Sequence, residues 1–581
     1  MNMVNVKING MPLSVPADYT ILQAAKSAGI DIPTLCYLKD LNEIGACRMC
    51  VVEVKGARSL VAACVYPVNE GMEVYTNTPK VIESRKMTLE MLLSVHNKAC
   101  LTCKRSNNCE LQTLCQELGV EDSTSYEGAM PDSTYDDSTY HLVRDNSKCI
   151  LCRRCVAACA NQHVAVIGPN SRGFDTHIGC MFEQPLANVP CVSCGQCIVA
   201  CPTGALTEKD QCADVLAALN DPEKYVVVQT APSIRATLGE CFGMPVGTNV
   251  EGKMVAALRR IGFQKVFDTD FGADLTIMEE AHEFIERVKN GGTLPMITSC
   301  SPGWVKFCEH YFPELLPNVS SCKSPQQMTG AMIKTWFAQK EGIDPSKIVV
   351  VSIMPCTAKK FEIHRDDMEG AGEGIADTDI VLTTRELARL IKLCRIDFNT
   401  LPDEAFDPAM GESTGAAVIF GSTGGVMEAA LRTAADTLEG RSVESIEYQE
   451  VRGGAGIKEA VYKIAGMDVK VAVVSGLNNA NEVLTKVKNG EGGYHFIEIM
   501  CCPGGCVNGG GQPIQPSSVR NFTDLRAARA QALYTQDANM PLRKSHENPL
   551  IKKAYEEFLG EPGGHKAHEL LHTTYVPRSR Y

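Results

Sequence analysis

The stretch "EIMCCPGGCVNGGGQP", residues 498–513, places the thiols of Cys501, Cys502 and Cys506 in a turn that also holds five glycines. Such cysteines are either incidental to a flexible surface turn or hold a group that the backbone approaches closely. Glycine allows that approach because it has no Cβ to collide. We therefore expect the glycines of residues 504–511 to lie against whatever Cys502 and Cys506 hold, and the other cysteines decide what that is.

The composition restricts the kind of protein. The chain has 581 residues, 27 cysteines and a formal net charge of −13, which suits several globular domains and argues against nucleic-acid binding. The start lacks a leader-like apolar segment, and no apolar run reaches the roughly 18 residues of a membrane span. We expect a cytoplasmic protein that binds neither membrane nor nucleic acid. In that compartment, cysteines at short spacings indicate metal ligation.

The first 79 residues are expected to form a [2Fe–2S] domain. Residues 4 to 15 alternate apolar and polar side chains around Asn9-Gly10, which indicates a hairpin, and a helix is expected from about Asp18 to Gly29. A small sheet on one helix, followed by a C-x2-C pair, resembles a plant-type ferredoxin of the β-grasp fold, although the first cysteine gap is wider than usual. A zinc site is the alternative. The candidate ligands are Cys36, Cys47, Cys50 and Cys64.

The segment "HNKACLTCKRSNNC", residues 96–109, offers one imidazole and three thiols. Zinc accepts this ligand set readily, but the segment lies between two stretches that look like electron carriers, where a redox-inert metal would interrupt transfer. We therefore expect a [4Fe–4S] cluster in a small helical domain, residues 80–120, with ligands His96, Cys100, Cys103 and Cys109. Residues 121–142 are acidic, without apolar periodicity, and are expected to be a linker.

Residues 143–210 carry the most specific cysteine pattern of the amino-terminal part. Two copies of C-x2-C-x2-C-x3-C, the second followed by proline, are the signature of bacterial ferredoxins with two [4Fe–4S] clusters. In that fold the fourth cysteine of each run binds the other cluster. One cluster is then expected on Cys149, Cys152, Cys155 and Cys201, and the other on Cys191, Cys194, Cys197 and Cys159.

From about residue 211 the pattern changes to alternating strands and amphipathic helices, which predicts a large α/β domain. "KYVVVQTAP" and "KIVVVSIMPC" are typical of buried strands, whereas "MVAALRRIG" and "TRELARLIKLC" have helical spacing. The chain has no glycine-rich nucleotide motif of the Rossmann or P-loop kind. We therefore expect no nicotinamide or flavin to bind to this chain itself.

Three segments of this domain place cysteine where a strand passes into a loop: "TSCSPGW" (298–304), "MPCTAKKFE" (354–362) and the stretch quoted first. Their order resembles the three signature segments of the [FeFe]-hydrogenases, and the cluster modules before them resemble the long form of that family. The resemblance implies an H-cluster, which is a [4Fe–4S] cubane joined to a two-iron unit with CO, cyanide and a bridging dithiolate. It assigns residues 211–581 to the catalytic domain, including a small-subunit-like carboxy-terminal segment.

The resemblance also implies the cubane ligands. Cys356, Cys502 and Cys506 match, with Cys506 as the bridge to the two-iron unit. The family has two adjacent cysteines in the first segment, a proton-relay thiol and then a ligand, but this chain has Cys300 followed by Ser301. Because thiolate suits iron better than hydroxyl, we assign Cys300 as the ligand and Ser301 to the relay. The alternative keeps Cys300 as the relay thiol and leaves serine at the ligand position.

Further roles follow from the same resemblance. It implies a proton relay through Glu280, Ser320, Glu283 and Arg287, whose helical spacing places the charged members on one face; an ordinary solvated face is the alternative. Lys359 and Ser233 match positions that contact cyanide, and Met354, Phe420 and Met500 match residues around the two-iron unit, although each could be plain core. Cys322 and Cys501 lie beside signature segments, and we hypothesise that they influence oxygen sensitivity or redox inactivation.

The sequence thus predicts an iron-only hydrogenase that interconverts protons, electrons and H₂. Its expected cofactors are one [2Fe–2S] cluster, three accessory [4Fe–4S] clusters and the H-cluster. The expected partners are ferredoxin, NAD(H)-handling iron–sulfur flavoprotein subunits, or both. The alternatives are a sensory hydrogenase of low turnover, an electron-transfer subunit of an NADH-oxidising complex, and an iron–sulfur assembly factor. The last two would lack the three H-cluster segments or the long amino terminus.

Overall fold

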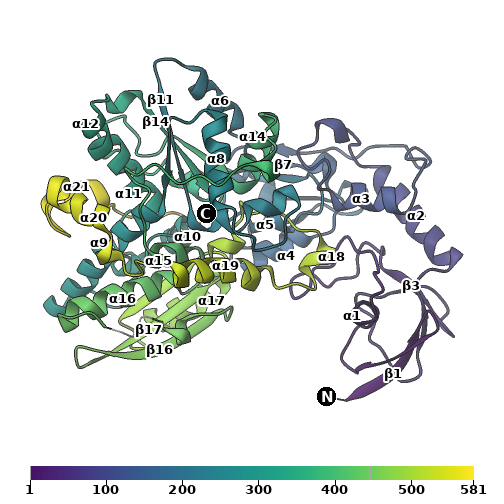
Figure 1. The fold of residues 1–581 in the computed structure, drawn as a ribbon. Coiled ribbons are helices and arrows are strands. Elements are labelled where there is room, and N and C mark those ends of the chain that lie inside the picture. The colour runs from purple at the N-terminus through teal and green to yellow at the C-terminus, as the bar shows by residue number, and fades with distance from the viewer. Residues whose placement is uncertain (1, 444–446, 581) are drawn as a thin grey trace.

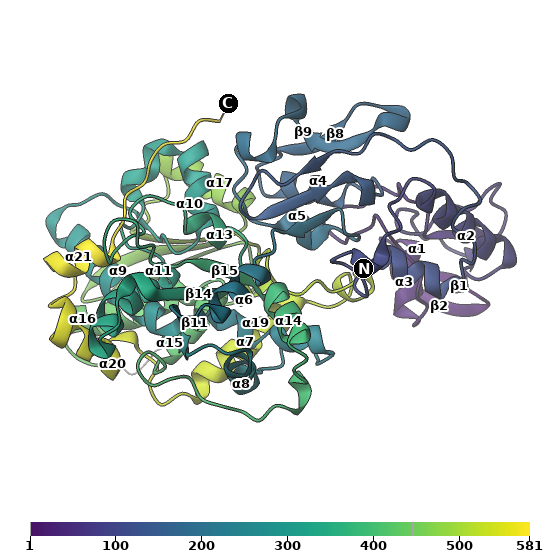
Figure 2. The same ribbon diagram turned by 90° about the horizontal axis from the view of Figure 1, so that it is seen from above.

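The computed structural model describes residues 2–443 and 447–580 and shows four cysteine-bearing units in one chain. The amino-terminal sheet lies at one end of the molecule and the large α/β domain at the other, with the two-cluster unit between them (Figures 1 and 2). None of the described helices combines the length and the apolar character that crossing a membrane requires.

The amino-terminal unit has the expected β-grasp form. Its sheet has the order β2-β1-β5-β3-β4, and β1 pairs antiparallel with β2 through the hairpin at Asn9-Gly10. Helix α1 (Ile21–Ser27) begins after Thr20, whose side chain forms a capping box with Gln23. The strands are β1 (Met3–Ile8), β2 (Met11–Pro16), β3 (Val51–Val54), β4 (Val61–Ala62) and β5 (Glu73–Tyr75).

The next two units are small and held mainly by loops. Helices α2 (Pro79–Leu93) and α3 (Glu110–Glu117) flank the segment with His96. Helices α4 (Arg154–Asn161) and α5 (Gln196–Ala200) each begin within one of the two cysteine runs. The expected linker is not wholly without structure, because β6 (Tyr135–Asp136) within it pairs with β7 (Leu142–Asp145). Its last part therefore packs as an edge of the two-cluster unit, whose third strand is β10 (Leu206–Glu208).

The large domain contains two sheets. The first is parallel with the order β12-β11-β14-β15, and the second has the order β13-β18-β17-β16 with only β16 antiparallel. Apolar cores lie on both faces of each sheet. The expected strand runs form β11 (Tyr225–Thr230) and β14 (Ile348–Met354), and the expected helical runs form α8 (Glu251–Ile261) and α14 (Thr384–Leu393). Helix α16 (Gly425–Glu439) belongs to the same domain.

The strand ends explain where the signature cysteines lie. Cys300, Cys356 and Cys502 follow the carboxyl ends of β13 (Met296–Ile297), β14 and β18 (Phe496–Met500) by two or three residues. Side chains at the carboxyl ends of parallel strands face a common crevice, which is where α/β sheets bind their ligands. Helix α9 (Asp270–Asn290), which carries the expected relay, packs against α11 (Pro325–Met332) and α16 beside this crevice.

Candidate metal centre

The four cysteines of the first unit lie together. The Cys36 amide donates to Cys47 Sγ at 3.3 Å, and the Cys50 thiol contacts Cys64 Sγ at 3.2 Å. The charges of Cys36 and Cys47 also act on Cys64, so the two pairs face each other. Four converging thiols in a β-grasp loop have the donor chemistry that a [2Fe–2S] cluster requires.

His96 and its three cysteines form a second group. His96 is 9% exposed, and its Nδ1 is buried without a hydrogen-bond partner. Burial, followed by the charge of Lys148, lowers the pKa of this imidazole to about 4, so the ring is neutral and able to ligate. Cys103 lies close enough to act electrostatically on Cys109. A buried imidazole nitrogen without a partner, close to a lysine on which Cys103 also acts, fits a histidine-ligated cluster.

The two cysteine runs of the third unit group in the crossed pattern that their motif implies. Cys155 interacts with Cys149, Cys152 and Cys201, and these four line one small cavity. Cys197 interacts with Cys159, Cys191 and Cys194, and these four line a second. Each cavity thus brings together four thiols, which fits a [4Fe–4S] cluster.

The first two units both contact the cysteine set that includes Cys152 and Cys201. The Asn42 amide donates to Cys36 O at 2.7 Å and to Cys152 O at 3.1 Å. Arg105, beside Cys103, donates to Cys201 O at 3.1 Å. Two electron-carrying sites therefore meet one common site.

The other cysteine set of the third unit packs directly on the signature segments. Thr357 donates to Ser193 O at 2.8 Å, and Gln196 donates to Asn508 O at 3.0 Å. The Cys501 thiol lies close enough to Cys194 and Cys502 that both thiols raise its pKa. Cys501 is therefore a structural link between an accessory cluster site and the signature site, which the sequence indicated only by its position.

Cys356, Cys502 and Cys506 meet in the crevice, together with Lys359. The three thiols act electrostatically on one another, and the charge of Lys359 favours the thiolates of Cys356 and Cys506. The Lys359 ammonium is buried and donates to Glu362 at 2.9 Å and to Ser324 Oγ at 2.7 Å. Three thiols beside a fixed cation fit one anionic metal cluster.

The glycines of the signature turn also allow a close approach to neighbouring protein backbone. A Cβ on Gly510 would lie 2.2 Å from Cys194 O, and one on Gly505, where φ is +91°, would lie 2.6 Å from the Thr423 nitrogen. Backbone atoms alone would therefore exclude side chains at these two positions. The turn is glycine-rich because it is clamped between the accessory-cluster loop and the loop before α16.

Cys300 and Ser301 point to different neighbours. The groups that act on the Cys300 thiol are Glu280, Cys506 and Glu498, and its burial raises its pKa well above the ordinary value. Ser301 Oγ instead accepts the Cys501 amide at 3.2 Å. The thiol therefore lies between Glu280 of the relay helix and the group formed by Cys506 and Lys359, which also acts on it. The hydroxyl lies toward Cys501.

The four expected relay residues form a hydrogen-bonded series. Glu280 is fully buried, its Oε2 has no partner, and burial, followed by the charge of Glu283, raises its pKa to about 8. Ser320 lies close enough to Glu280 to act on its pKa, and it donates to Glu283 Oε2 at 2.9 Å. Arg287 donates to Glu283 Oε1 at 2.5 Å. The series leads from Cys300 to the half-buried Arg287.

The remaining expected residues line the crevice or its walls. Ser233 accepts from Gln512 Nε2 at 3.2 Å. Phe420 and Met500 belong to the same apolar cluster, with Cys300 and Cys506 packed against it, whereas Met354 belongs to the core beside β14. Apolar walls with a few buried polar groups, among them the orphaned Glu280 oxygen, suit a bulky inorganic group.

Several polar residues at the site were missed in the sequence. The Ser299 amide donates to Glu280 and its hydroxyl donates to Cys322 O. Gln512 joins Ser233 to Thr237, and Glu362 binds Lys359. Ser321, Glu279 and His572 surround the outer end of the relay. Ser299 adjoins a signature segment, and Glu279 adjoins Glu280, which is a signal that could have found them; His572 has none, because its neighbours are distant in sequence.

Family models match most of the chain. Residues 224–510 match the iron only hydrogenase large subunit, C-terminal domain, and residues 523–578 match the iron hydrogenase small subunit. Residues 1–79 match a 2Fe-2S iron-sulfur cluster binding domain, 85–124 the NADH-ubiquinone oxidoreductase-G iron-sulfur binding region, and 148–207 a 4Fe-4S dicluster domain.

Relatives that match over the whole chain are also named as hydrogenases. The chain is 49% identical to the NADP-reducing hydrogenase subunit HndD of Solidesulfovibrio fructosivorans, over 100% of both chains. It is 45% identical to iron hydrogenase 1 of Clostridium pasteurianum, over 99% of this chain and 100% of that protein. Among solved structures, an [FeFe]-hydrogenase HydA1 of Chlamydomonas reinhardtii matches with a TM-score of 0.57 and 42% identity, over 64% of this chain and 99% of the other.

Proposed function

The chain belongs to the iron-only hydrogenase family, and from this premise we propose that it is the hydrogen-converting subunit of a cytoplasmic complex whose other subunits handle NAD(P)(H). The chain is an [FeFe]-hydrogenase and interconverts protons, electrons and H₂. The H-cluster, when bound, supplies the hydride chemistry. The residues of the chain hold that group, deliver electrons and move protons.

One observation supports the complex: two accessory sites converge on one cubane site. Asn42 links the [2Fe–2S] site to Cys152, and Arg105 links the His96 site to Cys201. A single electron donor needs one entry site for electrons, whereas two entry sites allow two partners with different reduction potentials. One relative is named as a subunit of an NADP-reducing hydrogenase, and residues 85–124 match a region of an NADH-oxidising enzyme. Ferredoxin is the second partner we propose.

The cofactor set that we propose follows the thiol groups. It comprises one [2Fe–2S] cluster, three accessory [4Fe–4S] clusters and the H-cluster, in domains at 1–79, 80–120, 143–210 and 211–581 with a linker at 121–142. The crossed grouping of the two cysteine runs and the orphaned His96 nitrogen support it. Iron and sulfide analysis of the purified protein tests the count.

We further propose that Cys300 is the relay thiol and that position 301 faces the cubane. The Cys300 thiol lies toward Glu280, and the Ser301 hydroxyl lies on the side of Cys501 and Cys502. Iron analysis of protein prepared without the two-iron unit tests this assignment. The Cys300→Ala variant should contain the iron of a full cubane and should lose turnover. Loss of the cubane in that variant would instead make Cys300 its ligand.

The proton path that we propose runs from Cys300 through Glu280 and Ser320 to Glu283, which Arg287 binds at the outer end of the relay. Buried carboxyl and hydroxyl groups in contact can pass a proton where water is excluded. The raised pKa of Glu280 keeps it protonated near neutral pH, so it can both donate and regain a proton.

Turnover with defined acceptors tests the proposed function. We expect the complex purified from its host to reduce NAD or NADP with H₂, with a rate that rises when oxidised ferredoxin is present. The chain alone, fully matured, should reduce viologen but not nicotinamide. If the purified protein reduces viologen but not nicotinamide, the proposed complex is refuted and the hydrogenase activity stands. Very low turnover with every acceptor would favour a sensory role.

A further inference from the structure

Arg287 ends the relay with a group that is poorly suited to release protons. Its guanidinium donates to Glu283 and to the carbonyls of Pro317, Asn318 and Val319 at 3.0 to 3.3 Å. An arginine keeps its proton at every ordinary pH, and these bonds fix the side chain. Arg287 therefore holds Glu283 in place, and a titratable group is needed elsewhere to exchange protons with solvent.

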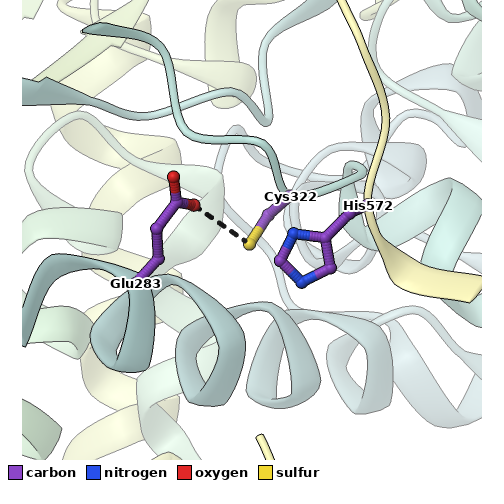
Figure 3. Close-up of side chains that lie close together, drawn as sticks. All are labelled: Glu283, Cys322 and His572. Atoms are coloured by element: carbon purple, nitrogen blue, oxygen red, sulfur yellow. Dashed lines mark hydrogen bonds between the residues drawn. The ribbon is translucent and has the colours of Figure 1, made fainter. Parts of the chain in front are cut away.

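His572 is that group. It follows α21 (His565–Leu571), and its backbone forms an antiparallel bridge with Cys322, directly after Ser321. Figure 3 shows the His572 ring beside Cys322, facing Glu283. His572 Nδ1 lies 2.8 Å from Ser321 Oγ, which lies 3.3 Å from Glu283 Oε2. One hydroxyl thus separates the imidazole from the relay carboxylate.

The second ring nitrogen fixes the tautomer. His572 Nε2 lies 3.0 Å from Glu279 Oε2, and Glu279 also accepts the Gly563 amide at 2.9 Å and the Tyr555 hydroxyl. A carboxylate at this position requires a proton on Nε2, which leaves Nδ1 free to gain or lose one. The neutral ring accepts the Ser321 hydroxyl, and the protonated ring donates to it.

The outer side of His572 faces an acidic cavity of about 480 Å³. The His568 ring lies 4.5 Å from the His572 ring, centroid to centroid. Other titratable groups that line the cavity are Lys323, Asp367, Glu369, Glu373 and Glu569. Carboxylates at the mouth of a path concentrate protons there. Around the ring itself, the charged or titratable groups are Glu279, Glu283, Cys322 and His568.

We propose that His572 and Ser321 form a proton port that joins the acidic cavity to the relay at Glu283. In the inward step the proton on His572 Nδ1 passes to Ser321 Oγ while the Ser321 proton passes to Glu283 Oε2. The imidazole becomes neutral, the carboxylate becomes a carboxylic acid, and the serine is unchanged. The outward step is the reverse, and His572 then exchanges with water or with His568 in the cavity. This inference rests on the proposed relay through Glu283.

Two substitutions in the fully matured enzyme test the port. His572→Gln retains a donor to Glu279 but cannot titrate, and Ser321→Ala removes the link while leaving the imidazole. We expect each to lower viologen-linked turnover about tenfold, with an increased solvent isotope effect and an unchanged KM for H₂. The double variant should be no slower than either single one, because both interrupt one path. His310→Gln, at a histidine that is also 9% exposed but remote from the relay, is the matched control.

Chemical rescue separates proton transfer from a structural role. His572→Ala opens a space beside the cavity, so added imidazole should restore turnover in this variant but not in Ser321→Ala. Wild-type turnover and isotope effect in both His572→Gln and Ser321→Ala would overturn the port. Glu283→Gln distinguishes the proposed relay from the proposed port. Full turnover in this variant as well would refute the relay through Glu283. An inactive Glu283→Gln variant beside port variants with normal turnover would refute only the port.

Discussion

Ser320→Ala separates proton transfer from stability at a single hydroxyl. Ser320 is fully buried and bridges the two relay carboxyls, with a hydrogen bond of 2.9 Å to Glu283. After its removal Glu283 still accepts the Ser321 amide at 3.1 Å and Arg287 at 2.5 Å. The loss in stability is therefore about 1 kcal/mol, the net value of one hydrogen bond. The loss in turnover should be about 100-fold or more, because a positioned proton donor contributes that much.

The assay is viologen-linked H₂ oxidation by protein whose H-cluster content is checked by infrared spectroscopy, with thermal unfolding measured in parallel. Ser321→Ala is the matched control, because it removes a hydrogen bond of 3.3 Å to the same oxygen outside the direct Glu280–Glu283 link. We expect it to lose about tenfold. Turnover of Ser320→Ala equal to that of the control, at full H-cluster content, would refute the direct link through Ser320.

Three other predictions concern electrons, stability and cations. Cys501→Ala removes the thiol that interacts with Cys194 and Cys502. The reduction potential of the cluster on Cys194 should then become more negative by about 40 mV in a redox titration followed by EPR. An unchanged potential contradicts this prediction. Burial and Glu283 raise the pKa of Glu280 from 4.5 to about 8, so the folded state retains a proton that the unfolded state has lost, and stability falls as pH rises through this window. Glu280→Gln should flatten that slope in thermal unfolding, and equal slopes would count against it. Ligand atoms within 4.8 Å of one another are offered by Glu283, Cys322 and His572. We therefore expect Zn²⁺ to inhibit turnover reversibly by blocking the port, and Cys322→Ala to weaken that inhibition. Equal inhibition of the variant and the wild type would place the ion elsewhere.

The sequence predicted what depends on local spacing. Cysteine runs place their thiols through a few backbone turns, so the groups around Cys36, Cys149 and Cys191 could be anticipated. The charged relay residues lie three and four positions apart on α9, which brings them to one face of any helix. The buried strands were visible as apolar runs for the same reason.

What could not be predicted depends on contacts between distant segments. His572 reaches Ser321 across 251 positions, and only the packing of α21 against the segment before α11 joins them. The signature glycines indicated a close approach, but the sequence could not tell that backbone atoms of Cys194 and Thr423 lie against two of them. The direction of the Cys300 thiol depends on the turn after β13 and not on residue type.

Residues 299–303 separate the two flows that meet at the active site. Ser299 donates to Glu280, on the proton side, whereas Ser301 accepts the Cys501 amide, on the electron side. A Cβ on Gly303 would lie 2.7 Å from Cys501 Sγ, so the segment packs tightly against the electron link. Cys300 lies between these two contacts, and a shift of this backbone would disturb both paths together. We therefore expect a substitution at Ser301 to change electron delivery through Cys501, and one at Cys300 to change proton exchange with Glu280.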